Sequence, residues 1–249
     1  LIERILPKDI SAEQAGIYAR AYRLFDAGNN ISYLFSVILL PLFAAVIKKG
    51  EDLQPLVKQS FGLMLSMTCI IAIVCIFYSQ NLMETLYHIQ ENESPTEYNN
   101  RIYESSRILQ ILMGSFVSIS VTYIFGTLLT ANGNLKQLNL VAVVGVIINL
   151  TLNFIFIPIF KSQGAAFTSL CVQLVTCVIQ FFIAKSYFSL RFGFKFWISI
   201  IAFITTSSLT TYILKSTSLQ WVYSFVISLF LGVIIAFITK VLDFKDLKE

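Results

Sequence analysis

The chain has 249 residues, of which 56% are hydrophobic and 13% are charged, and its formal net charge is +4. This composition lies outside the range of ordinary soluble domains and is typical of a protein that crosses a lipid bilayer. The basic residues are scattered between apolar segments and are not concentrated on one face, which argues against binding to nucleic acid. The sequence therefore predicts an integral membrane protein.

Apolar stretches of about 20 residues recur along the chain, and each is long enough to cross a hydrocarbon core of about 30 Å. The run 141–157 is apolar on all sides, which favours helices over strands of alternating polarity. The predicted fold class is all-α, a polytopic membrane helical bundle of about seven transmembrane helices. The predicted spans are 15–47, 61–83, 108–131, 138–157, 165–187, 196–214 and 221–241.

The first predicted span is longer than one crossing requires. We expect its N-terminal turns to project into water or to bend along the membrane interface, and we expect Pro41 to kink its far end. Because the chain begins at Leu1 without an initiator Met or a signal-like segment, we expect it to be a piece of a longer protein. The predicted organisation is 1–14 as the end of a preceding helix and an external connection, 15–187 as a core of five helices, and 188–249 as the last two helices and a cytoplasmic tail.

The orientation follows from the Lys and Arg residues of alternate loops, since the richer side is usually cytoplasmic. One side carries Lys48, Lys49, Lys58, Lys136, Lys185, Arg191, Lys195, Lys240, Lys245 and Lys248, and the other carries Arg4, Lys8, Arg101, Arg107, Lys161 and Lys215. The long acidic loop 84–106 falls on the poorer side. We therefore expect the chain to begin outside and to end in the cytoplasm. An odd number of helices would then precede it, and seven would give a total of fourteen.

Ionisable side chains inside membrane spans are costly and commonly mark functional sites. In the first span, one arc of the helix carries Arg20, Arg23, Asp26, Asn30 and Tyr33. Arg23 and Asp26 are three residues apart, so they can pair with each other and reduce the cost of burial. The alternative interpretation is that Arg20 and Arg23 extend to the outer headgroups from the end of a long helix.

Other predicted spans also carry polar stripes, and the candidate binding residues among them are Arg107, Asn149, Asn153, Gln173 and Gln180. A bundle that brings these faces together would enclose a hydrophilic lumen with a cationic outer part, suited to a large polar and anionic cargo. The alternative interpretation is that the amide side chains join neighbouring helices, because such residues are enriched at buried helix contacts in membranes. Both interpretations stay open from the sequence.

The sequence contains no nucleotide-binding loop and no ordered nucleophile and base, so an enzyme is not expected. Neither a catalytic residue nor a cofactor is predicted, although transport could draw on an ion gradient or on the membrane potential. A metal site is not predicted either, because the four cysteines lie within spans without CxxC pairing and the only histidine, His88, lies in the acidic loop.

The run from Gly16 to Leu24 resembles the helix that opens the C-terminal lobe of polysaccharide flippases of the Wzx type. These belong to the multidrug/oligosaccharidyl-lipid/polysaccharide exporter superfamily. The later run 128–134, with Asn149, Asn153, the pair 157–158 and the triplet 164–166, is similar to that family's cytoplasmic turn, Asn-containing helix, Ile-Pro exit and Gly-Ala-Ala re-entry. The chain departs from the pattern after Pro158, where 161–162 is Lys-Ser and family members usually place a glycine.

The resemblance implies the C-terminal lobe of a two-lobed, fourteen-helix transporter in the cytoplasmic (inner) membrane. Such a transporter turns a lipid-linked oligosaccharide from the cytoplasmic to the outer leaflet by alternating access, for surface polysaccharide such as lipopolysaccharide. The cationic role in its cavity would fall to Arg20, Arg23 and Arg107. The implied partners are the missing N-terminal lobe, the bilayer, the lipid-linked oligosaccharide and a polysaccharide polymerase.

Three other functions stay open. A peptidoglycan lipid-precursor flippase and a multidrug or organic-cation exporter share the superfamily fold, although cation binding would require more cavity carboxylates than Asp26. A membrane scaffold with no cargo is the alternative from a different class, and it would have no need of polar stripes on several helices. The last two spans are almost purely apolar, and we expect them to face lipid and to border the tail of a lipid-linked cargo.

Overall fold

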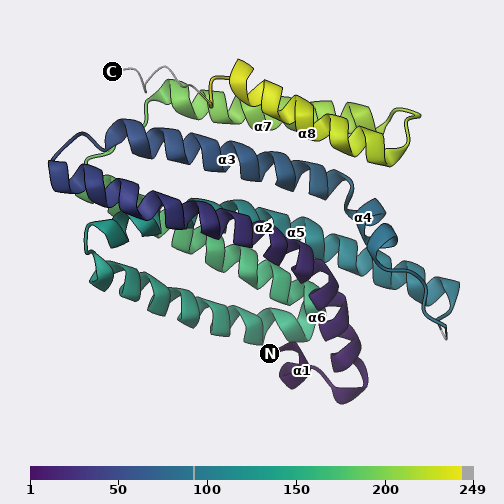
Figure 1. The fold of residues 1–249 in the computed structure, drawn as a ribbon. Coiled ribbons are helices and arrows are strands. Elements are labelled where there is room, and N and C mark those ends of the chain that lie inside the picture. Colours follow the sequence, from purple (N-terminus) through teal and green to yellow (C-terminus); the bar gives the residue numbers. More distant parts are fainter. Residues whose placement is uncertain (92, 243–249) are drawn as a thin grey trace.

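The computed structural model describes residues 1–91 and 93–242, and in this part of the chain the regular structure is entirely helical, without a strand (Figure 1). This arrangement confirms the predicted all-α membrane fold. The helices are α1 (Ile2–Ile5), α2 (Lys8–Lys49), α3 (Gln54–Phe77), α4 (Ser79–Leu86), α5 (Pro95–Ala131), α6 (Leu135–Tyr187), α7 (Phe194–Lys215) and α8 (Trp221–Ile238).

Six of the described helices are long and apolar enough to cross a membrane. The longest, α6, consists of two limbs that meet at Lys161, whose backbone (φ 52°, ψ −132°) is not helical. Figure 1 shows the limbs running in opposite directions, and each exceeds the roughly 20 residues that a crossing requires. The fold therefore supplies the seven crossings expected from the sequence.

Helix α5 lies at the centre of the bundle and packs against α2, α3, α4 and α6. It begins at Pro95, much earlier than the predicted span that starts at Ile108, so the expected long loop is partly helical. The reason is a capping box: the Ser94 Oγ accepts from the Glu97 N–H at 3.3 Å, and a Glu97 carboxylate oxygen accepts from the Ser94 N–H at 2.8 Å. Together with proline at the first helical position, this capping box is a sequence pattern typical of a helix N-terminus.

One further expectation about a single span needs correction. The predicted span 61–83 is divided between α3 and the short helix α4, which meet at Tyr78. Pro41 lies inside α2, which continues through it as one helix, and the kink expected there stays a prediction. The dark N-terminal part of α2 turns away from the rest of the helix in Figure 1, as expected for a segment longer than one crossing.

The lysine-rich ends of the helices lie together. The C-terminal ends of α2 and α8 and the N-terminal ends of α3, α6 and α7 all lie on the left of Figure 1, whereas α4 lies on the right. This end, called here the lysine end, carries Lys48, Lys49, Lys58, Lys136, Lys185, Arg191, Lys195 and Lys240. The grouping agrees with the predicted alternation of loops.

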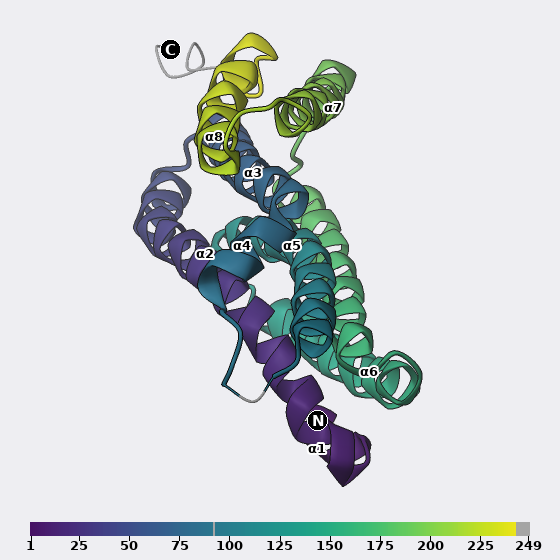
Figure 2. The same ribbon diagram turned by 90° about the vertical axis from the view of Figure 1, so that its right-hand side faces the viewer.

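Helices α7 and α8 form a separate outer layer that packs on α3, on the far side from α6 (Figure 2). Many side chains of α7 and α8 are exposed, as expected for surfaces that face lipid, and Leu174 of α6 is exposed as well. The outer layer is joined to the bundle near the lysine end by a group of aromatic rings whose centroids lie 5.2–6.5 Å apart. The members are Phe61, Phe125, Phe181, Phe192, Phe196 and Trp197.

Candidate functional site

Helix α2 has one packed face and one open face. On the packed face, Gly28 allows close approach of Phe116 in α5, since a Cβ atom at that position would lie 3.2 Å from its ring. One helical turn further, the hydroxyl oxygens of Ser32 and Ser120 lie 2.8 Å apart in a buried hydrogen bond. The opposite face, called here the open face, is uncovered by the described residues and carries Tyr22, Arg23, Asp26, Asn30 and Tyr33, all of them exposed. Most of the predicted stripe thus lies on one open surface.

The ion pair that the spacing of Arg23 and Asp26 allows is not formed in the structure. No ion pair within 4 Å joins Arg23 to Asp26 among the residues that the structure describes. Both side chains are exposed instead of buried, so neither needs the other to offset the cost of losing water. Arg23 and Asp26 are therefore available to a ligand or to another part of the protein.

Tyrosine side chains border the open face, and sequence reasoning included only one of them. The rings of Tyr18 and Tyr22 stack at 5.7 Å, and the ring of Tyr33 contacts that of Tyr123 in α5 edge-on at 6.0 Å. Next to Tyr123, the Oδ1 atom of Asn29 is buried. The four-residue spacing of Tyr18 and Tyr22 beside Arg23 was the signal available in the sequence.

The two limbs of α6 enclose further predicted residues. Asn149 and Gln173, one from each limb, line a pocket of about 310 Å³ between them. Asn153 donates a hydrogen bond to Asn149 Oδ1 at 3.0 Å and also lines a second pocket, of about 350 Å³, together with Tyr18 of α2. These three amide residues therefore lie in small pockets, the second of which reaches Tyr18 of α2.

Two predicted residues serve other contacts. The Oε1 atom of Gln180 lies 3.0 Å from the Cβ position of Gly126, so this amide is packed between α6 and α5. The exposed Arg107 donates to Gln110 Oε1 at 3.3 Å, and Gln110 in turn donates to Ser79 Oγ at 2.9 Å. For Gln180 the alternative of helix contact describes the structure better than a hydrophilic lumen.

Arg20 lies at one end of the bundle, and its role in a cavity stays a prediction. Its guanidinium lies 5.9 Å from the centre of the Tyr87 ring, and it lines a pocket of about 600 Å³ at the end of the bundle opposite the lysine end. The same pocket contains Arg101, which is only 7% exposed and binds both carboxylate oxygens of Glu93, at 2.5 and 2.6 Å. This ion pair holds the loop between α4 and α5 and lowers the pKa of Glu93.

The sequence profile of the family described as "Lipid II flippase MurJ" matches residues 9–235. The chain belongs to this family. The fold agrees with a solved structure titled "Lipid II flippase MurJ, inward closed conformation" at a TM-score of 0.75 and 15% sequence identity. The superposition covers 95% of this chain and 48% of that chain, so the chain spans about half the length of the solved MurJ structure. No curated protein matches the chain by sequence.

Membership of the MurJ family decides two sequence expectations. MurJ flippases are transporters and not catalysts of chemical reactions, so the prediction that the chain is not an enzyme is confirmed. The structural coverage likewise shows that the fold corresponds to about half of the solved MurJ structure. The narrower resemblance to the Wzx type is not confirmed, because the matching family is the one kept as an alternative, the peptidoglycan lipid-precursor flippases.

The turn between the α6 limbs explains the departure noted after Pro158. Lys161 has a positive φ of 52°, a backbone conformation that glycine adopts without strain and that costs other residues about 1–3 kcal/mol. The next residue, Ser162, donates its hydroxyl hydrogen to the buried Gln14 Oε1 at 2.6 Å, and Gln14 donates to Glu104 at 3.1 Å. These bonds fix the turn to α2 and α5, so the chain forms the turn without glycine there.

Proposed function

We propose that the chain forms one half of a flippase that moves a lipid-linked saccharide diphosphate of the peptidoglycan-precursor class across the membrane by alternating access. Membership of the MurJ family supports the transport of a lipid-linked precursor. The observation that carries the proposal for this chain is the open face of α2, on which Arg23, Asp26 and Asn30 are exposed while the opposite face is packed on α5.

A sugar diphosphate cannot cross about 30 Å of hydrocarbon unaided, because its charges and hydroxyl groups would lose their water. The open face would replace part of that water. Arg23 offers a planar, permanently charged donor to a phosphate, and the neighbouring amide and phenol groups offer hydrogen bonds to hydroxyl groups. The amide pocket between the α6 limbs, with Asn149 and Gln173, would extend the polar surface.

The remaining parts of the proposal follow from the same arrangement. The other lobe of the transporter would face the open face of α2 and close the cavity. The outer layer of α7 and α8, which exposes apolar side chains, would border the lipid tail of the cargo. The lysine end would lie in the cytoplasm, which places the C-terminus there and the protein in the cytoplasmic membrane as a multi-pass protein.

Cargo for surface polysaccharide, the finer function expected from the Wzx resemblance, has no observation in its favour beyond the shared superfamily. The two cargoes give different cellular results when the full-length protein is depleted. Loss of the proposed function would accumulate lipid-linked peptidoglycan precursor on the cytoplasmic side and cause lysis, whereas a polysaccharide flippase would leave the cell wall intact and remove surface glycan. A polymerase partner would be expected only in the second case.

The direct test is Arg23→Glu in the full-length protein, with Arg191→Glu as the matched control, because Arg191 is exposed in the connection that precedes α7. At equal protein levels, Arg23→Glu should fail to support growth and should reduce the outward translocation of labelled precursor at least tenfold, since the new carboxylate repels the diphosphate. Arg191→Glu should translocate normally. Normal translocation by Arg23→Glu would exclude the open face as the cargo surface.

A further inference from the structure

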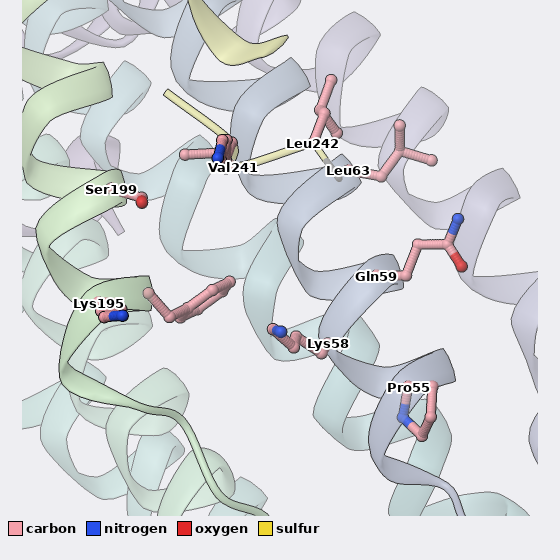
Figure 3. Close-up of a pocket in the computed structure, with 10 residues that line it drawn as sticks. Pro55, Lys58, Gln59, Leu63, Lys195, Ser199, Val241 and Leu242 are labelled. Carbon is pink, nitrogen blue, oxygen red and sulfur yellow. The ribbon is translucent and has the colours of Figure 1, made fainter. Parts of the chain in front are cut away.

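A pocket of about 190 Å³ lies at the lysine end, between α3, the first turns of α7 and the end of α8 (Figure 3). It is built from other helices than the open face of α2, so the proposed function does not use it. The residues that line it are Pro55, Lys58, Gln59, Leu63, Lys195, Phe196, Ser199, Lys240, Val241 and Leu242.

Lysines from α3, from α7 and from the turn after α8 line this pocket, and all of its described lining residues are neutral or basic. Figure 3 shows the side chains of Lys58 on α3 and Lys195 on α7 directed toward the space between these helices. Lys240 lies two residues after the last residue of α8. Bringing Lys195 and Lys240 together at the membrane end of a bundle costs Coulomb energy, which an anion bound between these two lysines would offset.

The fold holds these elements at close range. Gly62 of α3 lets the Val241 carbonyl approach, since a Cβ atom at position 62 would lie 2.6 Å from that oxygen. Lys240 has a positive φ of 57°, a conformation typical of glycine after a helix end, and the backbone closes there through the Leu242 N–H, which donates to the Ala236 carbonyl at 3.2 Å. A lysine therefore occupies a position that favours glycine, and it brings its charge to the pocket.

Two helix N-termini reinforce the positive potential. Helices α3 and α7 both begin beside the pocket, and their starts are joined by a reciprocal pair of bonds: Gln54 donates to the Arg191 carbonyl and accepts from the Arg191 N–H, each at 2.8 Å. The N-terminal end of a helix carries a partial positive charge and unpaired N–H groups, which favour a phosphate.

We propose that this pocket binds the phosphate of an anionic phospholipid headgroup. Ser199 and Gln59 offer neutral hydrogen bonds beside the lysines, while Leu63, Phe196 and Val241 provide an apolar wall for the start of the acyl chains. The pocket lies where apolar helices end, at the level of the headgroups of a surrounding bilayer. A membrane lipid would thus tie the outer layer of α7 and α8 to α3.

The test uses the purified full-length protein in neutral detergent and the melting temperature as readout. Dioctanoyl phosphatidylglycerol, dioctanoyl phosphatidylcholine and inorganic phosphate are titrated separately. The variant Lys195→Gln/Lys240→Gln is compared with the wild type and with Lys136→Gln/Lys185→Gln, which removes two lysines of the same end that do not line the pocket. Glutamine keeps the backbone at position 240 as strained as lysine does, so the comparison isolates charge.

Phosphatidylglycerol should raise the melting temperature of the wild type and of the control variant, with a half-maximal concentration at least about tenfold higher in the pocket variant. Equal responses of the pocket and control variants would overturn the site. A response to inorganic phosphate as strong as that to phosphatidylglycerol would overturn the lipid as its source. A cooperative melt without lipid shows that each variant is folded. Because the experiment does not measure transport, a negative result here is distinct from failure of the proposed function.

Discussion

Helices α2 and α5 are both long, both apolar and both marked by polar residues, yet they use those residues in opposite ways. In the most apolar 18-residue window of α5, 61% of residues are buried within the structure, whereas in that of α2 only 22% are. The hydroxyl groups of Ser106, Ser118 and Ser120 in α5 donate to carbonyl groups of their own helix. Among the described residues, Arg23, Asp26 and Asn30 on the open face of α2 form no hydrogen bond or ion pair with another helix, and Tyr33 contacts Tyr123 of α5.

The difference shows what a polar stripe in a membrane helix can and cannot indicate. On the central helix the polar side chains are buried or bond within the bundle, because neighbouring helices surround that helix on several sides. A stripe on a peripheral helix remains available to a cargo or to another lobe. The four predictions that follow test this contrast between a structural α5 and a functional face of α2, beginning with the largest expected change in stability.

Replacing Phe116 with alanine should give the largest loss of unfolding free energy. Its ring is 1% exposed and packs against Gly28, so truncation leaves a cavity between α5 and α2 that costs about 3 kcal/mol of unfolding free energy. The matched change Tyr33→Ala removes a ring that is 52% exposed and should cost less than about 1 kcal/mol. Unfolding of the full-length protein in mild detergent measures both. Similar losses in the two variants would contradict the division of α2 into packed and open faces.

Replacing Arg101 with alanine should be the next most damaging change. It leaves Glu93 without its ion-pair partner and releases the loop before α5, which should cost about 2 kcal/mol. This is less than the roughly 3–5 kcal/mol for a fully buried pair, because Glu93 is near the surface. Arg107→Ala, six residues further along the same helix, removes an exposed side chain and should change stability by about 0.5 kcal/mol or less. The melting temperatures of both variants decide whether burial, and not arginine as such, sets the cost.

The two glycines of α2 should respond to alanine with opposite signs. Gly28→Ala presses a methyl group against the Phe116 ring and should destabilise by about 1 kcal/mol, since that ring is itself fully packed. A Cβ atom at Gly16 would meet no atom within 4 Å, so Gly16→Ala should stabilise by about 0.5–1 kcal/mol through helix propensity alone. The same measurement of unfolding checks both changes, and a gain from Gly28→Ala would show that α2 does not pack tightly on α5.

Hydropathy sufficed to predict the fold class, because a span of about 20 apolar residues has few alternatives to a helix in lipid. Boundaries set by polar residues were missed. The early start of α5 depends on the box formed by Ser94 and Glu97, which hydropathy does not detect. The turn at Lys161 was expected from the Ile-Pro pair. The hydrogen bond that Gln14 accepts from Ser162 at this turn could not be predicted, because the two residues are 148 positions apart along the chain.

For the candidate site, helical periodicity placed Arg23, Asp26 and Asn30 on one face correctly, because periodicity gives the direction of side chains on a single helix. It could not tell which faces are covered by neighbouring helices. Gln180 therefore proved to be packed against α5, and Arg20 lies beside Tyr87 at the end of the bundle. The bordering Tyr123 comes from a different helix and needed the three-dimensional structure.

Acidification should reveal the smallest of the four effects. Arg101 lowers the pKa of Glu93 below its ordinary value of 4.5, so the folded protein holds this carboxylate ionised more firmly than the unfolded chain does. The stabilisation is therefore complete above about pH 4.5 and is lost as the pH falls through the lowered pKa of the folded state. Glu93→Gln removes the stabilisation that depends on the ionised Glu93 carboxylate. Glu91→Gln changes an exposed neighbour outside the ion pair and should keep that stabilisation. Melting temperatures between pH 6 and pH 3.5 should thus fall more steeply for the wild type and Glu91→Gln than for Glu93→Gln. Equal slopes would mean that the ion pair with Arg101 does not hold the start of α5.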